Sequence, residues 1–506
     1  MFAQRSKSDQ TDLFVEEGIE NPLWQERLQP TAVAQPKPIT SQVRHRHDWI
    51  AGVTTAFCDV VCWVLLYGFV GYVRRDAFFV GPFEFVLVDC VSLLVLLQAL
   101  YIVGGYNRNT ETRGLTYTAE HVLAVTAAAI ISSLLIYSAA AYQGDMKPSR
   151  GVLLISFVLF VPISLLYRRF FRRAVVASAA QRAFLVVGSG ELAKQFYNAY
   201  KHSPNQQQLE FVDNDSTRVG STIAGDGSPV IQGDIAAKLA NLDPRYNGVI
   251  LAESVDRLGQ DLIERLVRTQ FQRTRVYTLE SFYEAHWRHV PMHTIDPFWP
   301  LQMGFQLACI SPYNYLKRLF DLVASAVLLI LSSPIIVIAW LLVRLTSNGP
   351  AIFGQVRVGR EGQKFTAYKF RTMQMNGVEG ADGEIYTRED DPRITAVGKW
   401  LRKLRFDELP QLWNVLKGDM SLIGPRAEWD KCVERYENRI PFYHFRHLVK
   451  PGITGWAQVN YPYGESEEDA LNKLQYDLYY IRHYSLKLDA MIALKTVHIM
   501  LFGKGR

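Results

Sequence analysis

Long apolar runs alternate with short polar segments in the first third of the chain. Four of these runs are close to the ~20 apolar residues that a membrane-spanning helix needs. They predict a bundle of four spanning helices at 50–73, 83–104, 120–142 and 151–167. The residues before them, 1–48, are polar and hold no apolar stretch of the signal-peptide type, so we expect a disordered cytoplasmic tail there.

The basic residues around these runs predict the orientation of the bundle. Arg44 and Arg46 precede the first run, and the stretch YRRFFRR at 167–173 follows the fourth. Because cytoplasmic ends of spanning helices are enriched in Lys and Arg, both the tail and everything after residue 167 are expected in the cytoplasm. Arg74 and Arg75, in the first external loop, do not follow this rule.

Two acidic residues, Asp59 and Asp89, lie inside predicted spans. A charge is costly in the middle of a bilayer and is usually paired or functional. We expect these two carboxylates to face each other or polar neighbours within the bundle.

A fifth apolar segment, residues 315–345, is also long enough to cross a bilayer. However, Lys317 and Arg318 flank one end and Arg344 flanks the other, so neither end has the composition of an external end. This favours a re-entrant hairpin that enters and leaves the membrane on the cytoplasmic face. The alternative is an ordinary kinked span, which would place the rest of the chain outside.

Pro334, in the middle of this segment, predicts where the helix breaks. Proline removes one helix hydrogen bond and displaces the carbonyl of the residue four positions earlier, which is Ile330. Ser332 and Ser333 are placed to satisfy the backbone groups that such a break frees, as a broken helix within a membrane requires.

Residues 180–300 form a second region, in which apolar strands alternate with helices. The pattern Gly188-x-Gly190-x-x-Ala193 follows the first strand, and Asp213 follows the second, which resembles the dinucleotide-binding fingerprint of a Rossmann-like domain. A lone pattern of this kind is a weak signal. Either a nicotinamide dinucleotide site or a regulatory or purely structural module is possible, and we favour the module.

Other motifs in this region carry less weight. Tyr197 and Lys201 match the tyrosine–lysine pair of nucleotide-sugar dehydratases and epimerases, but they follow the glycine loop too closely for that role. Three histidines at 286–293 are expected in a solvated loop or an interface segment rather than a zinc site. The five cysteines form no CxxC pair, which argues against a zinc site or a disulfide framework.

Composition and charge narrow the class of partner. Hydrophobic residues make up 49% of the chain, and the net charge is +6, with basic residues concentrated beside the apolar runs. This pattern favours lipid headgroups or phosphates over nucleic acid.

The stretch FDELPQLWNVLKG carries the candidate chemistry. Its apolar residues recur at helical spacing, Pro410 is tolerable only in a first turn, and Gly418 predicts the end of the helix. Asp407 is therefore expected at or near the N-cap, with Glu408 beside it. The simplest interpretation is a well-capped helix with an acidic first turn.

The residues around this pair indicate more than a cap. Lys369 and Arg371 lie in YKFRTM, Arg393 in DDPRIT, and Arg426 with Glu428 in GPRAE. Two carboxylates among so many cations suggest a metal ion and a polyphosphate, because arginine offers bidentate contacts to phosphate. An ionised aspartate in such a place could attack phosphorus and form a covalent intermediate.

The chain from about residue 313 to 506 resembles the bacterial sugar transferase family. The resemblance rests on KRLFDLVASAVLLILSSPIIVIAWLLVRLTSNGPAIFGQVRVGREGQKFTAYKFRTM, then DDPRITAVGKWLRKLRFDELPQLWNVLKGDMSLIGPRAE, then KPGITGWAQVN. The upstream regions are similar to those of the long-form members. The resemblance implies transfer of sugar-1-phosphate from a UDP-sugar to undecaprenyl phosphate, with release of UMP, through an aspartyl-phosphosugar intermediate. This reaction would initiate exopolysaccharide or O-antigen synthesis.

The resemblance also implies roles for individual residues. Asp407 would be the nucleophile, and Glu408 would help to hold Mg²⁺ or assist the second step. The metal ligands would be Asp407 and Glu408. The substrate-binding groups would be Lys369, Arg371, Arg393, Arg426, Glu428, Thr454 and Gln458. Lys317, Arg318, Ser333 and Pro334 would belong to the re-entrant hairpin.

The resemblance implies a bacterial inner-membrane protein with several membrane passes and its catalytic domain on the cytoplasmic face. Its partners would be membrane lipid, a second copy in a homodimer, and downstream glycosyltransferases, with no nucleic acid. The expected fold is a four-helix membrane bundle, a Rossmann-like α/β domain and a monotopic, α-rich catalytic domain. The corresponding boundaries are 1–48 for the tail, 49–173 for the bundle, 180–300 for the α/β domain, and 313–506 for the catalytic domain with its hairpin at 315–345.

Two other functions stay open at this point. A membrane-tethered nucleotide-sugar dehydratase or epimerase would need a tyrosine–lysine pair well downstream of the glycine loop, and the sequence offers none. A non-enzymatic scaffold of polysaccharide assembly would be expected to have lost the acidic pair, which is intact.

Overall fold

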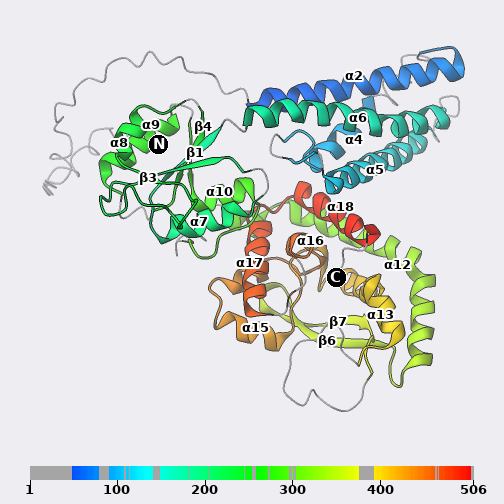
Figure 1. Ribbon diagram of the computed structural model, residues 1–506. Coiled ribbons are helices and arrows are strands. Elements are labelled where there is room, and N and C mark those ends of the chain that lie inside the picture. The colour runs from blue at the N-terminus through cyan, green and yellow to red at the C-terminus, as the bar shows by residue number, and fades with distance from the viewer. Residues whose placement is uncertain are drawn as a thin grey trace, which may run out of the picture. The chain divides into compact units, whose positions relative to one another are not determined.

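Within the part of the chain that is described, apolar helices are followed by a parallel sheet and then by an α-rich C-terminal unit (Figure 1). The predicted tail lies, up to residue 47, outside the described residues. The computed structural model describes residues 48–78, 90–107, 110–112, 114–140, 149–179, 182–203, 206–243, 245–253, 258–271, 274–295, 299, 304–374, 393–461, 464 and 466–502.

The apolar runs of the first third form helices. Three of them, together with α12 further along the chain, are long and apolar enough to cross a membrane. Three of the four predicted spans are therefore confirmed as helices of sufficient length. The second, at 83–104, is described only from Cys90, and residues 83–89 lie outside the described part. The helices are α2 (Asp48–Arg75), α4 (Val91–Ile102), α5 (Leu115–Ala140) and α6 (Arg150–Ala179).

A buried ion pair joins two of these helices. Asp59 in α2 and Arg168 in α6 are nearly inaccessible to solvent, and the two guanidinium nitrogens donate to the two carboxylate oxygens at 2.7 and 2.6 Å. Tyr167 donates a further hydrogen bond to Asp59. A buried charge is tolerated when it is paired and hydrogen-bonded in this way. The expectation that Asp59 meets polar neighbours is confirmed, whereas Asp89 lies outside the described residues.

The middle of the chain forms a five-stranded sheet in the order β3-β2-β1-β4-β5, and every neighbouring pair is parallel. All five residues of the central strand are buried, as expected for a parallel strand that is covered on both faces. The strands are β1 (Ala183–Val187), β2 (Gln208–Val212), β3 (Ile231–Gln232), β4 (Tyr246–Leu251) and β5 (Arg275–Thr278).

Alternate side chains of β1 point into two different cores. Phe184 and Val186 pack with α7 (Glu191–Lys201) and α10 (Leu279–His286), whereas Leu185 and Val187 pack with α8 (Ile235–Ala240) and α9 (Gln260–Phe271). The period of two along the strand therefore places helices on both faces of the sheet. The predicted alternation of strands and helices over this region is confirmed.

The C-terminal unit has one large core, formed by residues such as Tyr443, Leu478, Tyr480 and Ile481. The elements after α12 (Tyr313–Thr346) are β6 (Ile352–Val358), η5 (Arg360–Gly362), β7 (Lys364–Phe370), α13 (Ala396–Lys403), η6 (Phe406–Glu408), α14 (Gln411–Lys417), β8 (Ser421–Ile423), α15 (Asp430–Glu437), η7 (Tyr443–Leu448), β9 (Gly452–Thr454), α16 (Trp456–Asn460), α17 (Glu467–Arg482) and α18 (Leu486–Phe502).

Residues just before α12 also belong to this core. Val290, Trp299 and Phe305, the last of these in α11 (Gly304–Ile310), are buried in it. The N–H of Val290 donates to the carbonyl of Gln475 at 3.1 Å. Of the two settings expected for the histidines at 286–293, a solvated loop or an interface segment, the contact of Val290 favours the second, and the C-terminal core includes residues upstream of position 313.

Helix α12 holds Pro334 in its interior, and its ribbon changes direction along its length (Figure 1). The hydroxyl of Ser333 donates to the carbonyl of Ile330 at 2.7 Å, which is the carbonyl that the proline displaces. Ser332 donates to the carbonyl of Leu328 at 2.6 Å. The predicted role at the break is confirmed for Ser333, whereas the carbonyl that Ser332 bonds is not the one that Pro334 frees.

Both ends of α12 contact the C-terminal unit. Near its start, Arg318 donates to the carbonyls of Val415 and Leu416, at 2.6 and 2.8 Å. Near its end, Ala339 and Val343 are buried in one small core with other residues of the unit. Between these contacts the side chains are largely exposed and apolar, for example Ile330 at 72% and Leu331 at 69%.

Candidate active site

Asp407 lies in a tight turn between two short helices. Arg405 lies two residues after the end of α13 and has a φ of +56°. The single 3-10 turn Phe406–Glu408 follows it. Helix α14 begins only at Gln411, with Pro410 as its N-cap residue. The prediction that Asp407 caps this helix is therefore wrong, because the left-handed residue starts a separate turn that closes before the proline. The predicted helix end at Gly418 is confirmed by its φ of +98°.

The carboxylate of Asp407 accepts no hydrogen bond from any residue in the described ranges. Burial and the neighbouring charge of Glu408 raise the pKa of Asp407 to about 6, against the opposing charges of Lys369, Arg426 and Arg402. At neutral pH the group is still mostly ionised, by roughly ten to one. Asp407 is thus an ionised carboxylate whose oxygens are not committed to another side chain.

Glu408 differs from Asp407 because its carboxylate is bound by arginine side chains. Nη1 of Arg426 donates to its Oε1 at 2.9 Å, and Arg405 lies 3.9 Å from its Oε2. Burial would raise the pKa of Glu408, but the charges of Arg426 and Arg405 lower it below its usual value. Glu408 therefore stays ionised under all ordinary conditions.

Lys369 in β7 completes the group of cations around Asp407. Burial and the charges of Arg357 and Arg426 lower the pKa of Lys369 to about 8, and the charge of Asp407 opposes this shift. An amine that is half buried and crowded by arginines is stabilised by an added negative charge. The site is accordingly suited to an anion.

One of the predicted phosphate-binding arginines, Arg371, is bound elsewhere. Arg371 is buried, and its Nη2 donates to the carbonyl and to the hydroxyl of Ser347 at 2.9 Å each, just beyond the end of α12. Arg393 is exposed, and its backbone carbonyl accepts a hydrogen bond from Gln374 at 2.9 Å. Neither arginine is among the strongest charges that act on Asp407, and the role of Arg393 stays a prediction.

The remaining predicted residues lie in β9, in α16 and in the loop before α15. Thr454 in β9 makes a 2.7 Å hydroxyl contact with Thr496, and Gln458 donates to the carbonyl of Ile453 at 3.1 Å. The side chain of Glu428 makes no hydrogen bond within the described residues, and it acts electrostatically on Arg357 and Lys473.

Two arginines near the site were not singled out from the sequence. Arg402 lies five positions before Asp407, lowers its pKa, and donates from Nε to the hydroxyl of Thr372 at 2.9 Å. Arg357 in β6 acts on both Lys369 and Glu408. The basic run KWLRKLR could have pointed to Arg402, whereas no local pattern connects Arg357 with residues 50 positions later.

Within the described ranges, no group of three or more Asp, Glu, His or Cys side chains is arranged to hold a metal ion. Asp407 and Glu408 offer two carboxylates, one of them already bound by Arg426. Magnesium is commonly held by one or two carboxylates together with substrate phosphates and water. The pair fits such an ion only when a phosphate-bearing substrate supplies the other ligands.

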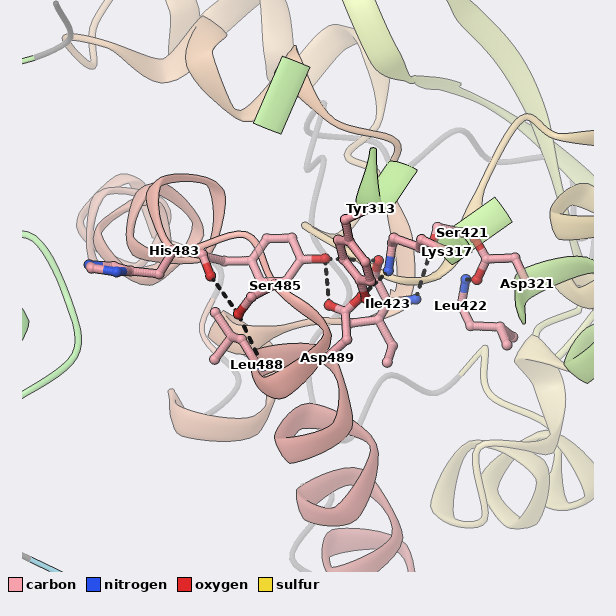
Figure 2. A network of polar contacts seen from close by, with 11 residues as sticks. Tyr313, Lys317, Asp321, Ser421, Leu422, Ile423, His483, Ser485, Leu488 and Asp489 are labelled. Carbon is pink, nitrogen blue, oxygen red and sulfur yellow. Dashed lines mark hydrogen bonds and ion pairs between the residues drawn. The ribbon is translucent and has the colours of Figure 1, made fainter. Parts of the chain in front are cut away.

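A polar network attaches the start of α12 to the strand that leads into the Arg426 loop (Figure 2). Lys317 forms a buried ion pair with Asp489, which also accepts from the hydroxyls of Tyr313 and Tyr480 at 2.6 and 2.8 Å. Asp321 accepts from the N–H of Leu422 in β8 at 3.0 Å. The apolar helix is thereby fixed to the segment that ends at the active site.

In the glycine loop of the α/β region, a backbone N–H is hydrogen-bonded to a carboxylate of the same chain. Gly188 has a φ of +103°, and the N–H of Ser189 donates to the carboxylate of Asp213 at 2.9 Å. In a dinucleotide-binding fold, this N–H and the start of the helix would meet the pyrophosphate. A cavity of about 510 Å³ lies beside the loop, and its charged lining residues are Asp213, Asp215, Arg218, Glu253, Asp261 and Arg265.

The apolar helices indicate a membrane protein, and the two carboxylates among cations form a candidate catalytic group in its C-terminal unit. Residues 312–503 match the family model described as bacterial sugar transferase. The chain is 43% identical over 190 residues to the uncharacterized sugar transferase EpsL of Bacillus subtilis, covering 38% of this chain and 89% of that relative. The chain therefore belongs to the bacterial sugar transferase family.

Two further relatives carry names with a stated activity. One is the UDP-N-acetylgalactosamine-undecaprenyl-phosphate N-acetylgalactosaminephosphotransferase of Aeromonas hydrophila, 40% identical over 262 residues, or 52% of this chain and 60% of the relative. The other is the UDP-glucose:undecaprenyl-phosphate glucose-1-phosphate transferase of Klebsiella pneumoniae, 45% identical over 193 residues, or 37% and 41%. The chain thus spans 60% and 41% of the lengths of these two proteins.

Proposed function

We propose that the protein transfers sugar-1-phosphate from a UDP-sugar to undecaprenyl phosphate, giving undecaprenyl-diphosphate-sugar and UMP. The observation that carries the proposal is the state of Asp407, an ionised carboxylate without a hydrogen bond in the described part of the chain, surrounded by Lys369, Arg402 and Arg426. The names of the Aeromonas and Klebsiella relatives support the same reaction.

In the first step, a carboxylate oxygen of Asp407 attacks the phosphorus that bears the sugar. A bond forms between this oxygen and phosphorus, and the bond from that phosphorus to the bridging oxygen of the diphosphate breaks. The bridging oxygen leaves with its electron pair as part of UMP. Lys369, Arg402 and Arg426 stabilise the negative charge that moves onto the leaving phosphate, because cations in a partly buried site act more strongly than in water.

In the second step, an oxygen of undecaprenyl phosphate attacks the phosphorus of the aspartyl phosphosugar. The new phosphorus–oxygen bond completes the diphosphate, and Asp407 leaves as a carboxylate. Its pKa of about 6 makes it a moderate nucleophile that is also a good leaving group at neutral pH. A covalent intermediate thus replaces one difficult displacement by two easier ones.

Magnesium is part of this proposal, with Asp407 and Glu408 as the residues that would hold it. Bound there, the ion would neutralise charge on the substrate diphosphate. Glu408 is kept ionised and oriented by Arg426, whose Nη1 lies 2.9 Å from its Oε1. The carboxylate of Glu408 is therefore ready to accept a cation without a preceding loss of a proton.

We also propose that α12 is a re-entrant helix and that the catalytic unit lies on the cytoplasmic face. Both ends of α12 contact the same unit, and the exposed apolar side chains lie between these contacts. A straight helix of 34 residues would be about 51 Å long, at about 1.5 Å per residue, and would carry its ends far apart. A break at Pro334 would let both ends of α12 contact the same unit. It would also bring the active site to the membrane surface where the lipid phosphate lies.

The test is to identify the nucleotide released from a panel of UDP-sugars by full-length protein in nanodiscs, with Mg²⁺ and undecaprenyl phosphate. We expect UMP, and no UMP from Asp407→Asn. Asp430→Asn is the matched control, because Asp430 lies in the same unit and pairs with Lys364 at 3.0 Å. Release of UDP would show glycosyl transfer instead, and UMP release by Asp407→Asn would remove the nucleophile assignment.

A further inference from the structure

The loop that carries Arg426 is held by its backbone. Four consecutive carbonyls of this loop accept hydrogen bonds from outside it, which is unusual for an irregular segment, whose polar groups are more often left to water. The N–H of Gly452 donates to Pro425 at 2.9 Å, Arg446 to Arg426 at 2.9 Å, Arg357 to Ala427, and the N–H of Val358 to Glu428 at 3.2 Å.

One of these donors, Arg446, is itself almost completely buried, with 6% of its surface exposed. Its Nη2 lies 2.9 Å from the carbonyl of Arg426 and 2.9 Å from Oδ2 of Asp477. Asp477 in α17 is 1% exposed, and Nη1 of Arg446 donates to the hydroxyl of Tyr443. The guanidinium thus connects three segments that are distant in the sequence.

The geometry explains why this contact reaches the active site. The carbonyls of Pro425 and Arg426 belong to the two peptide planes on either side of the Arg426 Cα, so holding both planes fixes the direction in which the side chain leaves the backbone. That side chain extends to Glu408, with Nη1 at 2.9 Å from Oε1. A guanidinium and a carboxylate placed in this way lie directly beside Asp407.

The charges of Arg446 and Asp477 are consistent with a structural role for this pair in holding the Arg426 loop. A buried guanidinium needs a paired carboxylate, since an unpaired charge in the interior is strongly unfavourable. Asp477 supplies that charge and leaves the remaining donors of Arg446 free for the backbone of the loop. Arg446 is not among the strongest charges acting on Asp407, and its contact toward the site is the hydrogen bond to the carbonyl of Arg426.

We propose that Arg446 is a positioning residue for the transfer reaction: held by Asp477, it fixes the backbone of Arg426 so that the Arg426 side chain reaches Glu408 beside Asp407. This inference rests on the proposed function. It adds two residues, Arg446 and Asp477, that lie 39 and 70 positions after Asp407 in the sequence and do not belong to the predicted site.

A double-mutant cycle tests the inference. Arg446→Lys keeps the charge but cannot bridge the carbonyl and the carboxylate as the planar guanidinium does. We expect kcat for UMP release to fall by about 10- to 100-fold, the effect of a small misplacement, with KM for the UDP-sugar within about two-fold. In an Arg426→Ala background, the same change should lower kcat by less than about three-fold, because residues that act through one another are not additive.

The control variant is Arg439→Gln. Arg439 is exposed and pairs with Glu467 at 3.0 Å, so its loss should leave kcat unchanged in both backgrounds. If Arg446→Lys lowers kcat equally with and without Arg426, or leaves kcat unchanged in the presence of Arg426, the positioning role is wrong.

A second variant covers the case in which Arg446→Lys does not fold. Replacing both partners, Arg446→Met with Asp477→Leu, removes the pair without leaving a buried charge, which proteins often tolerate. Its thermal midpoint should remain close to that of the native protein while kcat falls as in Arg446→Lys. A folded double variant with native kcat would overturn the proposal.

The same measurements separate this inference from the proposed function. If Asp407→Asn retains UMP release, the proposed function itself fails. If Asp407→Asn is inactive and the cycle is additive, the proposed function stands and only the role of Arg446 fails.

Discussion

Nη1 of Arg426 lies 2.9 Å from Oε1 of Glu408, whereas Asp407, the residue before it, accepts no hydrogen bond within the described part of the chain. Two adjacent carboxylates therefore have different states. Burial raises the pKa of Asp407 to about 6, and the arginines lower that of Glu408. Environments that separate the pKa values of two neighbouring acids in this way indicate different chemical roles for the two groups.

The first prediction concerns the covalent intermediate. Without undecaprenyl phosphate, the protein should release one equivalent of UMP per active site and then stop, because the phosphosugar remains on Asp407. Glu408→Gln should keep this burst but lower its rate by about 10²- to 10³-fold, the loss typical of one electrostatic group. Rapid quenching with a radiolabelled UDP-sugar measures both. Continuous UMP release without acceptor would instead indicate hydrolysis by water.

The second prediction concerns pH. Asp407 must be ionised to attack, so kcat/KM should fall about ten-fold per unit as pH drops below about 6. Lys369 must be protonated to neutralise phosphate, so the rate should also fall above about pH 8. Rates of UMP release between pH 5 and 10 give the profile. In Lys369→Arg, the alkaline limb should disappear, because a guanidinium does not lose its proton in this range.

The third prediction concerns Arg371. Because it is buried and bonded to Ser347, Arg371→Gln should destabilise the protein by about 1–3 kcal/mol, the value of a lost hydrogen bond to a charged group. KM for the UDP-sugar should stay unchanged. Thermal unfolding and steady-state kinetics on the same preparation check this. A raised KM with native stability would restore the substrate-binding role that the sequence suggested.

The fourth prediction concerns the path of α12. Tyr315, near its start, is 84% exposed, and Asn348 lies just beyond its end and is exposed too. If the helix is re-entrant, cysteines placed singly at 315 and 348 in a cysteine-free chain should both resist an impermeant maleimide in intact cells. Both should react after lysis. Labelling of one position but not the other in intact cells would indicate a spanning helix.

The fifth prediction concerns the glycine loop. The carboxylate of Asp213 already takes the N–H of Ser189, and the charged lining of the adjacent cavity holds four acids and two arginines. A pyrophosphate would meet net negative charge there, so we expect no binding of NAD at millimolar concentration. Equilibrium dialysis with labelled NAD measures this, and Asp213→Asn provides the comparison. Saturable binding to the native protein would contradict it.

Local patterns predicted a large part of the fold. The apolar runs gave helices of spanning length, and the alternation in residues 183–280 gave a parallel sheet. The serine–proline pair at 333 and 334 was predicted correctly because its partner, Ile330, lies only three residues away. Such features depend on neighbours in the sequence, and their physics can be applied without knowledge of the tertiary structure.

The site was predicted less completely. Asp407, Glu408, Lys369 and Arg426 come together as expected, but Arg371 points to Ser347 although it lies two residues from Lys369. Residues two apart in a strand face the same side, but β7 ends at Phe370, so the alternation no longer fixes the direction of Arg371 and distant packing decides it. Arg446 could not be found either, because its partners lie 20 and 31 positions away.

The bend in α12 has a consequence for the biosynthesis of the protein. The carbonyl of Ile330, which Pro334 frees, accepts from the hydroxyl of Ser333 within the helix itself, so it needs no donor from residues that follow. During translation, the apolar segment leaves the ribosome before Asp407 and Arg426 are synthesised. The bend can therefore form before the rest of the C-terminal unit, which then folds onto a helix that is already bent.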